Sequence, residues 1–223
     1  MFCFGNSLYS RYCSALQTIT IPDGITSIGE SAFDYSGLTS VTFPENVTSI
    51  GNSAFRNTGL TSVTIPENVT QIGDYAFYYT KLTSIAIPDN VTSIGDSAFM
   101  YCTGLETVTF GENSQLETIG EAAFKNCSKL TGITIPESIT SINSGVFVNS
   151  GLTTIAIPDA VTGIRPSAFD GCVDLTTITF TENSKLETIG YDAFYETGLT
   201  TIDIPDTVTE IWDYAFYDDR LSS

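Results

Sequence analysis

The feature that most constrains this chain is a 22-residue unit that recurs along its whole length. Residues 38–59 read LTSVTFPENVTSIGNSAFRNTG. A period of this size is typical of a solenoid, in which each unit buries its apolar face only by stacking on its neighbours. No linker interrupts the series, so we expect one elongated domain. The units begin 22 to 25 residues apart, at Leu16, Leu38, Leu60, Leu82, Leu105, Leu130, Leu152, Leu175 and Leu199.

Each unit has the pattern of a short strand followed by a turn. In residues 40–43, apolar side chains alternate with polar ones, which predicts a strand with one face inward. All units run in the same direction, so we expect the strands to pair in parallel. Val47 and Ile50 supply two further inward anchors, and Ala54 and Phe55 are expected to open a short helical turn, with the phenyl ring plugging the interior. Proline, which ends the strand, follows it at Pro22, Pro44, Pro66, Pro88, Pro136, Pro158 and Pro205.

A corner is expected after the second anchor, where six units carry glycine. We expect this corner to need either a positive φ or a close approach of two backbones. Asn143 tolerates a positive φ, but Arg165 and Trp212 fit it poorly, so those two corners are expected to be built differently. The six glycines are Gly29, Gly51, Gly73, Gly95, Gly120 and Gly190.

Two units depart from the pattern together. The units that start at Leu105 and Leu175 replace the proline and add two residues before the second anchor. We expect these insertions to bulge the first turn without breaking the stack.

The consensus L-x-x-I-x-I-P-x-x-V-x-x-I-G-x-x-A-F-x-x-C-x-x-L resembles the BspA-type leucine-rich repeat. The resemblance covers residues 16–220, and the opening segment FGNSLYSRYCSAL echoes the end of a unit, with Phe4 in place of isoleucine and Tyr9 in place of phenylalanine. It implies a leucine-rich-repeat solenoid of α/β type with a right-handed coil. A parallel β-sheet is expected on one face, and short helical turns and loops on the other.

This resemblance also implies how the single domain, residues 1–223, is divided. Residues 1–15 would form a degenerate or truncated N-terminal repeat. Residues 16–198 would form eight repeats, and residues 199–223 the last repeat with a C-terminal cap, for which the bulky ring of Trp212 is a candidate.

Members of the family are typically surface or secreted proteins of bacteria and protists, implicated in adhesion and in binding host or matrix proteins. The resemblance therefore implies a non-catalytic module that binds a protein or a glycan at the cell surface or after secretion. It carries over no catalytic residue. A structural spacer within a larger protein stays open as an alternative. The opening residues lack the features of a signal peptide, so we expect any export signal to have been removed or to lie outside this sequence.

The composition argues against several classes of function. With 26 acidic and 8 basic residues, the net charge is −18, which repels nucleic acid and anionic membranes. No apolar run approaches the roughly 20 residues that cross a bilayer. Histidine is absent, and the polar residues form evenly spaced columns instead of a convergent catalytic group. We therefore expect no enzymatic activity, no cofactor and no metal site.

An acidic residue follows the strand in every unit. Calcium binding along this column is an alternative, because hard oxygen ligands suit calcium. A straight ladder of single acids, however, does not supply several converging ligands, so a solvated turn face is the favoured interpretation. The column comprises Asp23, Glu45, Glu67, Asp89, Glu112, Glu137, Asp159, Glu182 and Asp206.

The outward strand positions form columns of small hydroxyls, among them Thr42, Thr64 and Thr109, at a spacing of about 5 Å. Threonine favours exposed strands, and this preference is the simplest explanation. The columns also resemble the ice-contacting face of some β-solenoid antifreeze proteins, so ice binding stays as a third alternative.

Tyrosines gather just after the plugging phenylalanines, at Tyr35, Tyr78, Tyr79 and Tyr101. Exposed aromatic rings with a polar tip are common anchors of protein or sugar recognition. The simpler interpretation is that the rings cover gaps between units and contact no partner. Among the surface features this cluster is nevertheless the strongest candidate. The candidate binding residues are therefore Tyr35, Tyr78, Tyr79, Tyr101, Thr42, Thr64 and Thr109.

The five cysteines show neither tight spacing nor a CxxC pattern, so they predict no disulfide framework and no zinc site. Cys102 and Cys127 occupy the same slot of adjacent units, where a separation of about 5 Å is compatible with a disulfide. A small buried thiol is the commoner role of such a residue. The redox state of the cysteines stays open.

Overall fold

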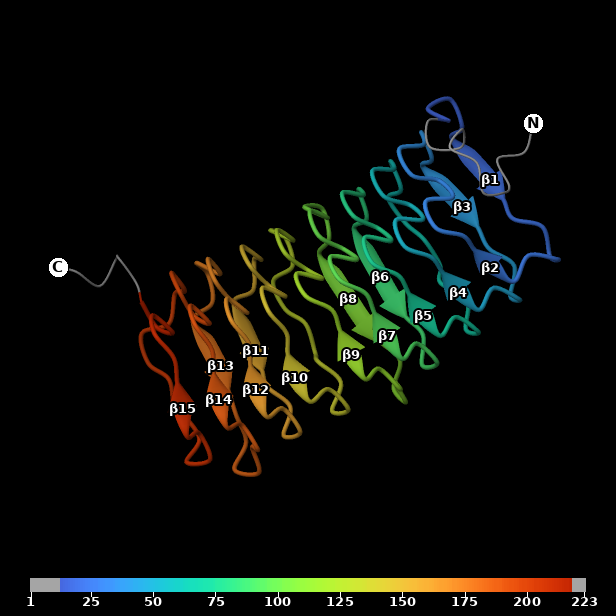
Figure 1. The fold of residues 1–223 in the computed structure, drawn as a ribbon. Coiled ribbons are helices and arrows are strands. Elements are labelled where there is room, and N and C mark those ends of the chain that lie inside the picture. Colours follow the sequence, from blue (N-terminus) through green and yellow to red (C-terminus); the bar gives the residue numbers. More distant parts are fainter. Residues whose placement is uncertain (1–12, 218–223) are drawn as a thin grey trace.

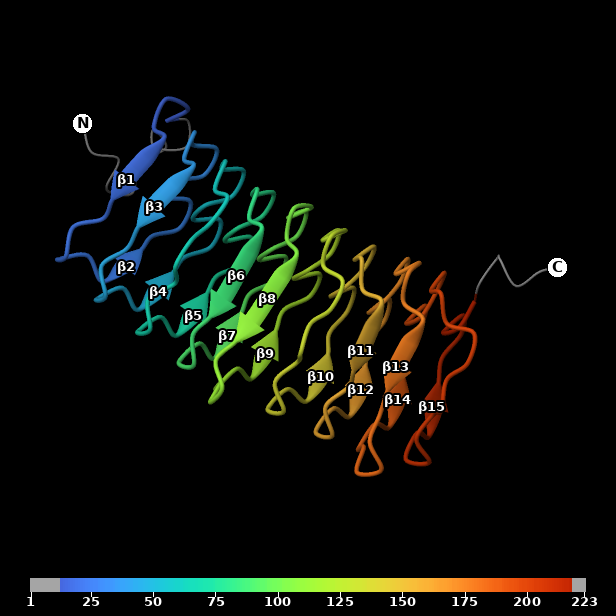
Figure 2. The same cartoon turned by 180° about the vertical axis from the view of Figure 1, so that it is seen from behind.

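A computed structural model of the chain describes residues 13–217 as a row of stacked coils. Figure 1 and Figure 2 show the coils side by side from one end of an elongated body to the other. We number them coil 1 to coil 9, each beginning at one of the nine leading leucines. The solenoid expectation is thereby confirmed. The features predicted at Phe4 and Tyr9, and the end of the cap after residue 217, lie outside the described residues.

Each coil contains up to two short strands, and all pairs are parallel and in register. In the first pair, for example, Val41 lies opposite Ile19. The first strands are β1 (Thr18–Thr20), β3 (Ser40–Thr42), β6 (Ser84–Ile87), β8 (Thr107–Phe110), β11 (Thr154–Ala156) and β13 (Thr177–Thr179). The second strands are β2 (Ser27–Ile28), β4 (Ser49–Ile50), β5 (Gln71–Ile72), β7 (Ser93–Ile94), β9 (Thr118–Ile119), β10 (Ser141–Ile142), β12 (Gly163–Ile164), β14 (Thr188–Ile189) and β15 (Glu210–Ile211).

The row of first strands is interrupted at regular intervals. It consists of the three two-stranded sheets β1–β3, β6–β8 and β11–β13. The equivalent segments of coils 3, 6 and 9 form no strand. In every sheet the second coil ends its strand segment with phenylalanine, at Phe43, Phe110 and Phe180, where the other coils have isoleucine. The solenoid therefore has a period of three coils superimposed on the period of one.

The row of second strands has a single break. One sheet runs β2-β4-β5-β7-β9 and the other runs β10-β12-β14-β15, so the break separates coil 5 from coil 6. There the side-chain amide of Asn143 donates to the carbonyl of Ile119 at 2.7 Å. In the intact junctions a backbone amide makes this bond, as Gly120 does to Ile94 at 2.8 Å.

The return side of each coil, residues 51–58 in coil 2, is not helical, and the expectation of a short helical turn is wrong. The described residues contain no helix. Ser53 and Asn57 have φ values of 55° and 56°, in the left-handed region, which an α-helix does not tolerate. The amides of Ser53, Phe55 and Asn57 donate to carbonyls of coil 3 at 2.7, 2.8 and 2.8 Å. Three such bonds connect each successive pair of coils from coil 1 to coil 9.

The core is a spine of stacked phenyl rings, as the sequence predicted for the plugging position. Neighbouring ring centroids lie 5.2 to 5.9 Å apart, with interplanar angles of 2° to 15°. Phe55 and Phe77 are fully buried. Each ring fills one coil and contacts the ring in the next. The spine consists of Phe33, Phe55, Phe77, Phe99, Phe124, Phe147, Phe169, Phe194 and Phe216.

Close approach of the preceding coil explains five of the six glycine corners, all except Gly29 of coil 1. A Cβ on Gly51 would lie 2.8 Å from the backbone nitrogen of Glu30, too close for a real contact. Among the described glycines, positive φ occurs away from these corners, at Gly145 and Gly171.

The corners at Arg165 and Trp212 keep the backbone bond of the glycine corners. Their amides donate to the second strand of the preceding coil at 2.8 and 2.9 Å, as Gly51 does at 2.8 Å. Neither Arg165 nor Trp212 has a positive φ, so both bonds form without a left-handed residue at the corner.

Candidate binding site

An aromatic patch crosses the return sides of coils 1 to 4. Its rings come from three slots of the repeat: the position two residues before the spine phenylalanine and the two positions after it. We call this surface the tyrosine patch. It consists of Tyr35, Arg56, Tyr75, Tyr78, Tyr79 and Tyr101.

Tyr78 lies at the centre of the patch. Its ring centroid is 5.8 Å from that of Tyr75, 5.7 Å from that of Tyr101 and 6.2 Å from that of Tyr79. Burial raises the pKa of the Tyr78 phenol, with a smaller contribution from the neighbouring Tyr101. Tyr79 is 59% exposed, so the cluster presents ring surface to the solvent. The structure thus brings together three of the predicted tyrosines and adds Tyr75.

The backbone does not account for tyrosine at these positions. Tyr35, Tyr75 and Tyr79 have φ values of 55°, 55° and 56°. A bulky residue is strained in this left-handed region, whereas asparagine adopts it at a smaller cost. Coil 2 uses Ser53 and Asn57 in the slots that Tyr75 and Tyr79 occupy in coil 3. The aromatic side chains are therefore placed against the local backbone preference.

Arg56 gives the patch a fixed positive charge. Its Nε and Nη2 donate to the two carboxylate oxygens of Asp34 at 2.9 and 2.7 Å. The Asp34 side chain is 1% exposed, and that of Arg56 is 33% exposed. The Arg56 guanidinium carbon lies 5.3 Å from the ring centroid of Tyr35, which connects the fourth predicted tyrosine to the patch. The hydrogen bonds to Asp34 raise the pKa of Arg56.

Sequence reasoning missed two members of the patch. Tyr75 stands in a slot that holds serine in four other coils, and no aromatic residue was expected there. Arg56 and Asp34 occupy the same slot of adjacent coils with opposite charges. That pairing was available in the aligned repeat as a signal for an ion pair between coils.

The three candidate threonines form a separate group on the first-strand segments. Thr42 lies opposite Thr20 in the pair β1–β3, and Thr109 lies opposite Ala86 in the pair β6–β8. Thr64 belongs to coil 3, whose segment forms no strand. All three are exposed. Because the sheets are interrupted, the threonine columns do not form one regular array. This favours the explanation that threonine is simply preferred in exposed strands. Measurement of thermal hysteresis tests the ice-binding alternative.

The acidic column makes structural hydrogen bonds in two coils. Asp89 accepts a bond from the backbone amide of Asn113 at 3.0 Å, and Asp159 accepts one from the Thr181 hydroxyl. Within residues 13–217, no three histidine, cysteine or carboxylate side chains lie close enough to hold a metal ion.

The cysteines that share one slot are buried thiols. Cys102 and Cys127 are free, and their Sγ atoms donate to the carbonyls of Phe77 and Phe99 at 3.1 and 3.2 Å. Burial raises the pKa of Cys102 to about 11 and that of Cys127 well above its ordinary value. The interpretation as core residues is confirmed, since a disulfide does not join them.

Comparison with known families decides the classification. A sequence profile of the BspA type leucine rich repeat region matches residues 4–115 and 105–222. The chain belongs to this BspA-type family. Its leading leucines, corner glycines and spine phenylalanines are therefore the shared framework of a leucine-rich repeat, and such repeats are typically non-catalytic.

Solved structures show the same fold. A leucine-rich repeat protein from Bacteroides ovatus is 25% identical with a TM-score of 0.61, covering 91% of this chain and 71% of its own. A leucine rich cell surface protein from Faecalibacterium prausnitzii is 28% identical with a TM-score of 0.53, covering 90% of this chain. The pneumococcal vaccine antigen PcpA is 22% identical with a TM-score of 0.65, covering 86%, and at this identity it shows the fold alone.

This BspA-type chain spans 60% of the length of the Faecalibacterium protein and 61% of that of PcpA. No curated protein matches it. None of its described residues forms a helix that could cross a bilayer.

Proposed function

We propose that this BspA-type solenoid is a non-catalytic recognition module of a surface or secreted protein, and that it binds a protein or glycan partner through the tyrosine patch. The surface location is supported by the similarity to the Faecalibacterium cell surface protein. The recognition role rests on the patch itself.

One observation carries the proposal. Exposed tyrosine rings cluster around Tyr78 beside an arginine held by Asp34, and most of them stand in slots where the backbone favours small residues. Tyr35, Tyr75 and Tyr79 are 49%, 42% and 59% exposed. Tyrosine and arginine are the residues that most often dominate binding energy, because they offer a large apolar area together with a polar end. Arg56 is already oriented by Asp34, so it loses little freedom when a partner binds.

The test is capture of partners on immobilised protein, with host surface and matrix proteins in one experiment and a glycan array in the other. The double variant Tyr78→Ser with Tyr79→Ser removes the centre of the patch. We expect it to weaken binding by about tenfold or more, as the loss of aromatic anchors does. A matched control is Tyr195→Ser, which changes the same slot as Tyr78 in coil 8.

The control and the parent should bind equally well, and all variants should still be folded at the temperature of the binding experiment. If the double variant captures every partner of the parent protein equally well, the tyrosines only cover gaps between coils. In that case the spacer alternative explains the chain better.

A further inference from the structure

The first-strand face is open on both sides of coil 6. In paired coils, the amide that follows the strand donates to the next coil, as Ile157 does to Thr179 at 3.0 Å. Phe110 and Ile135 occupy this slot in coils 5 and 6. Within the described residues neither amide makes the equivalent bond, and residues 132–135 pair with neither β8 nor β11. Backbone donors and acceptors along this segment are therefore free to bind a ligand.

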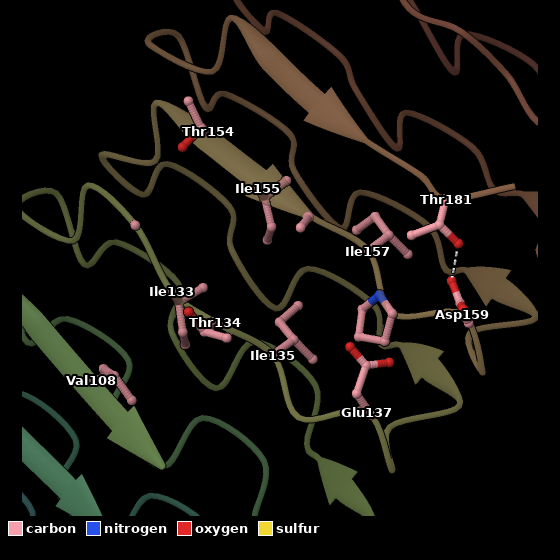
Figure 3. A pocket seen from close by; sticks show the side chains of 13 residues that line it. Val108, Ile133, Thr134, Ile135, Glu137, Thr154, Ile155, Ile157, Asp159 and Thr181 are labelled. Carbon is pink, nitrogen blue, oxygen red and sulfur yellow. Dashed lines mark hydrogen bonds between the residues drawn. The ribbon is translucent and has the colours of Figure 1, made fainter. Parts of the chain in front are cut away.

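Two adjoining hollows of about 580 and about 640 Å³ lie along this unpaired segment. Both are lined by Val108, Thr134, Ile135 and Glu137. Figure 3 shows aliphatic side chains of coils 5 to 7 side by side, with Glu137 and Asp159 together at one end. We call the two hollows the strand-face groove. Its outward-facing floor consists of the small residues Gly132, Thr134, Thr154 and Ala156, which alternate with isoleucines buried in the core.

The charge of the strand-face groove has one sign. Glu112, Glu137 and Asp159 line it, and no lysine or arginine does. The ion pairs found in residues 13–217 are those of Arg56 with Asp34 and of Lys129 with Glu106, so the carboxylates of the groove are not neutralised by a cation of the chain. An acidic rim of this kind is complementary to a ligand with cationic side chains.

We propose that the strand-face groove binds an extended, lysine- or arginine-bearing segment of a partner protein. An extended chain advances about 3.3 Å per residue, so four residues of such a segment match the length of residues 132–135. Its main chain supplies partners for the unpaired amides and carbonyls, as in recognition by strand addition. Its side chains lie over the small floor residues, and its cationic ends reach the carboxylates of Glu137 and Asp159. This second site lies on the first-strand segments and is independent of the tyrosine patch.

The experiment measures the binding of a fluorescein-labelled heptapeptide of alternating valine and lysine to the whole chain by fluorescence anisotropy. The double variant Glu137→Gln with Asp159→Asn removes two rim charges and keeps the size of both side chains. We expect its affinity for the peptide to fall by about fivefold to tenfold, since each partly exposed ion pair contributes modestly. The control Asp23→Asn with Glu45→Gln removes the same charge beside the paired junction of coils 1 and 2 and should bind within about twofold of the parent.

Two further peptides separate the contributions of charge and main chain. A valine–glutamate peptide should not bind, and a valine–lysine peptide methylated on alternate amides should bind more weakly than its parent. The proposal is overturned if the parent peptide does not bind or if methylation has no effect. It is also overturned if both double variants lose affinity equally, because the net charge of −18 then explains the attraction. The variant Tyr78→Ser with Tyr79→Ser should bind the peptide normally, so failure here is distinguishable from failure at the tyrosine patch.

Discussion

The return side and the first-strand side of this solenoid are built from the same repeats but differ in continuity. On the return side, three backbone bonds join each successive pair of coils, and the phenyl spine beneath them has no gap from Phe33 to Phe216. On the first-strand side, pairing is present in three of the eight junctions between coils, those of β1–β3, β6–β8 and β11–β13. The return side therefore holds the stack together, whereas the first-strand side tolerates open junctions.

This difference indicates what each side can offer a partner. The return side is rigid, so side chains that it carries are held in fixed positions, as the tyrosine patch requires. The first-strand side leaves backbone groups unpaired, which suits an extended ligand. The predictions below test this contrast through stability, from the largest expected effect to the smallest.

The sharpest test of the contrast compares two truncations within coil 3. Phe77→Ala should lower the free energy of unfolding by about 3–5 kcal/mol, because it removes a fully buried ring that contacts the spine on both sides. Val63→Ala, on the unpaired first-strand segment, should cost about 1 kcal/mol, since its side chain is only partly buried. Urea unfolding of the two variants measures both values, and equal costs would contradict the division of roles.

The ion pair of the tyrosine patch should contribute more to the free energy of unfolding than an ion pair outside the patch. Arg56→Met leaves the Asp34 carboxylate, 1% exposed, without its partner and should cost about 2 kcal/mol. This is less than for a fully buried pair, because the Arg56 side chain is 33% exposed. Lys129→Met, which breaks the exposed pair with Glu106, should cost under about 0.5 kcal/mol. Urea unfolding curves of the two variants, recorded at the same ionic strength, measure both costs. Equal costs would mean that Asp34 does not hold Arg56 in place.

The buried thiols predict a loss of stability at alkaline pH. In the unfolded chain a thiol ionises with a pKa near 9.0, whereas the pKa of buried Cys102 is about 11. Above pH 9 the unfolded state releases a proton that the folded state retains, so the free energy of unfolding falls as the pH rises towards 11. Cys102 alone should account for about 1 kcal/mol of this loss at pH 10.

A matched variant isolates that contribution. Thr80 occupies the slot of Cys102 in the preceding coil, so Cys102→Thr should be accommodated without repacking. Unfolding in urea at pH 8 and at pH 10 should show a smaller decrease for the variant than for the parent. The same decrease in both proteins would mean that other groups cause the alkaline loss.

Much of the fold could be predicted from the sequence, because the repeat expresses it nine times. The parallel register, the buried phenyl ring in each coil and the close approach at Gly51 follow from the spacing of apolar residues and glycine. The return side could not be predicted in the same way. Ala54 and Phe55 are compatible with a helical turn, and serine and asparagine at positions 53 and 57 do not by themselves reveal two left-handed residues.

The interruption of the first strands left a signal in the sequence that a one-unit alignment does not show. Phe43, Phe110 and Phe180 recur in every third unit, so comparison of units in groups of three would have shown the longer period. For the candidate site, the tyrosines were found because of their chemistry. Arg56 was missed because its role depends on a residue 22 positions earlier in the sequence.

The smallest expected effect separates a recognition surface from a structural one. Tyr79 is 59% exposed, and serine occurs naturally in left-handed slots of this chain, so Tyr79→Ser should change the free energy of unfolding by under about 0.5 kcal/mol. Tyr78→Ser should cost about 1 kcal/mol, because its ring is half-buried against three others. If Tyr79→Ser destabilises the chain as much as Tyr78→Ser does, the exposed ring is part of the return-side packing. The patch would then be explained by stability, without any partner.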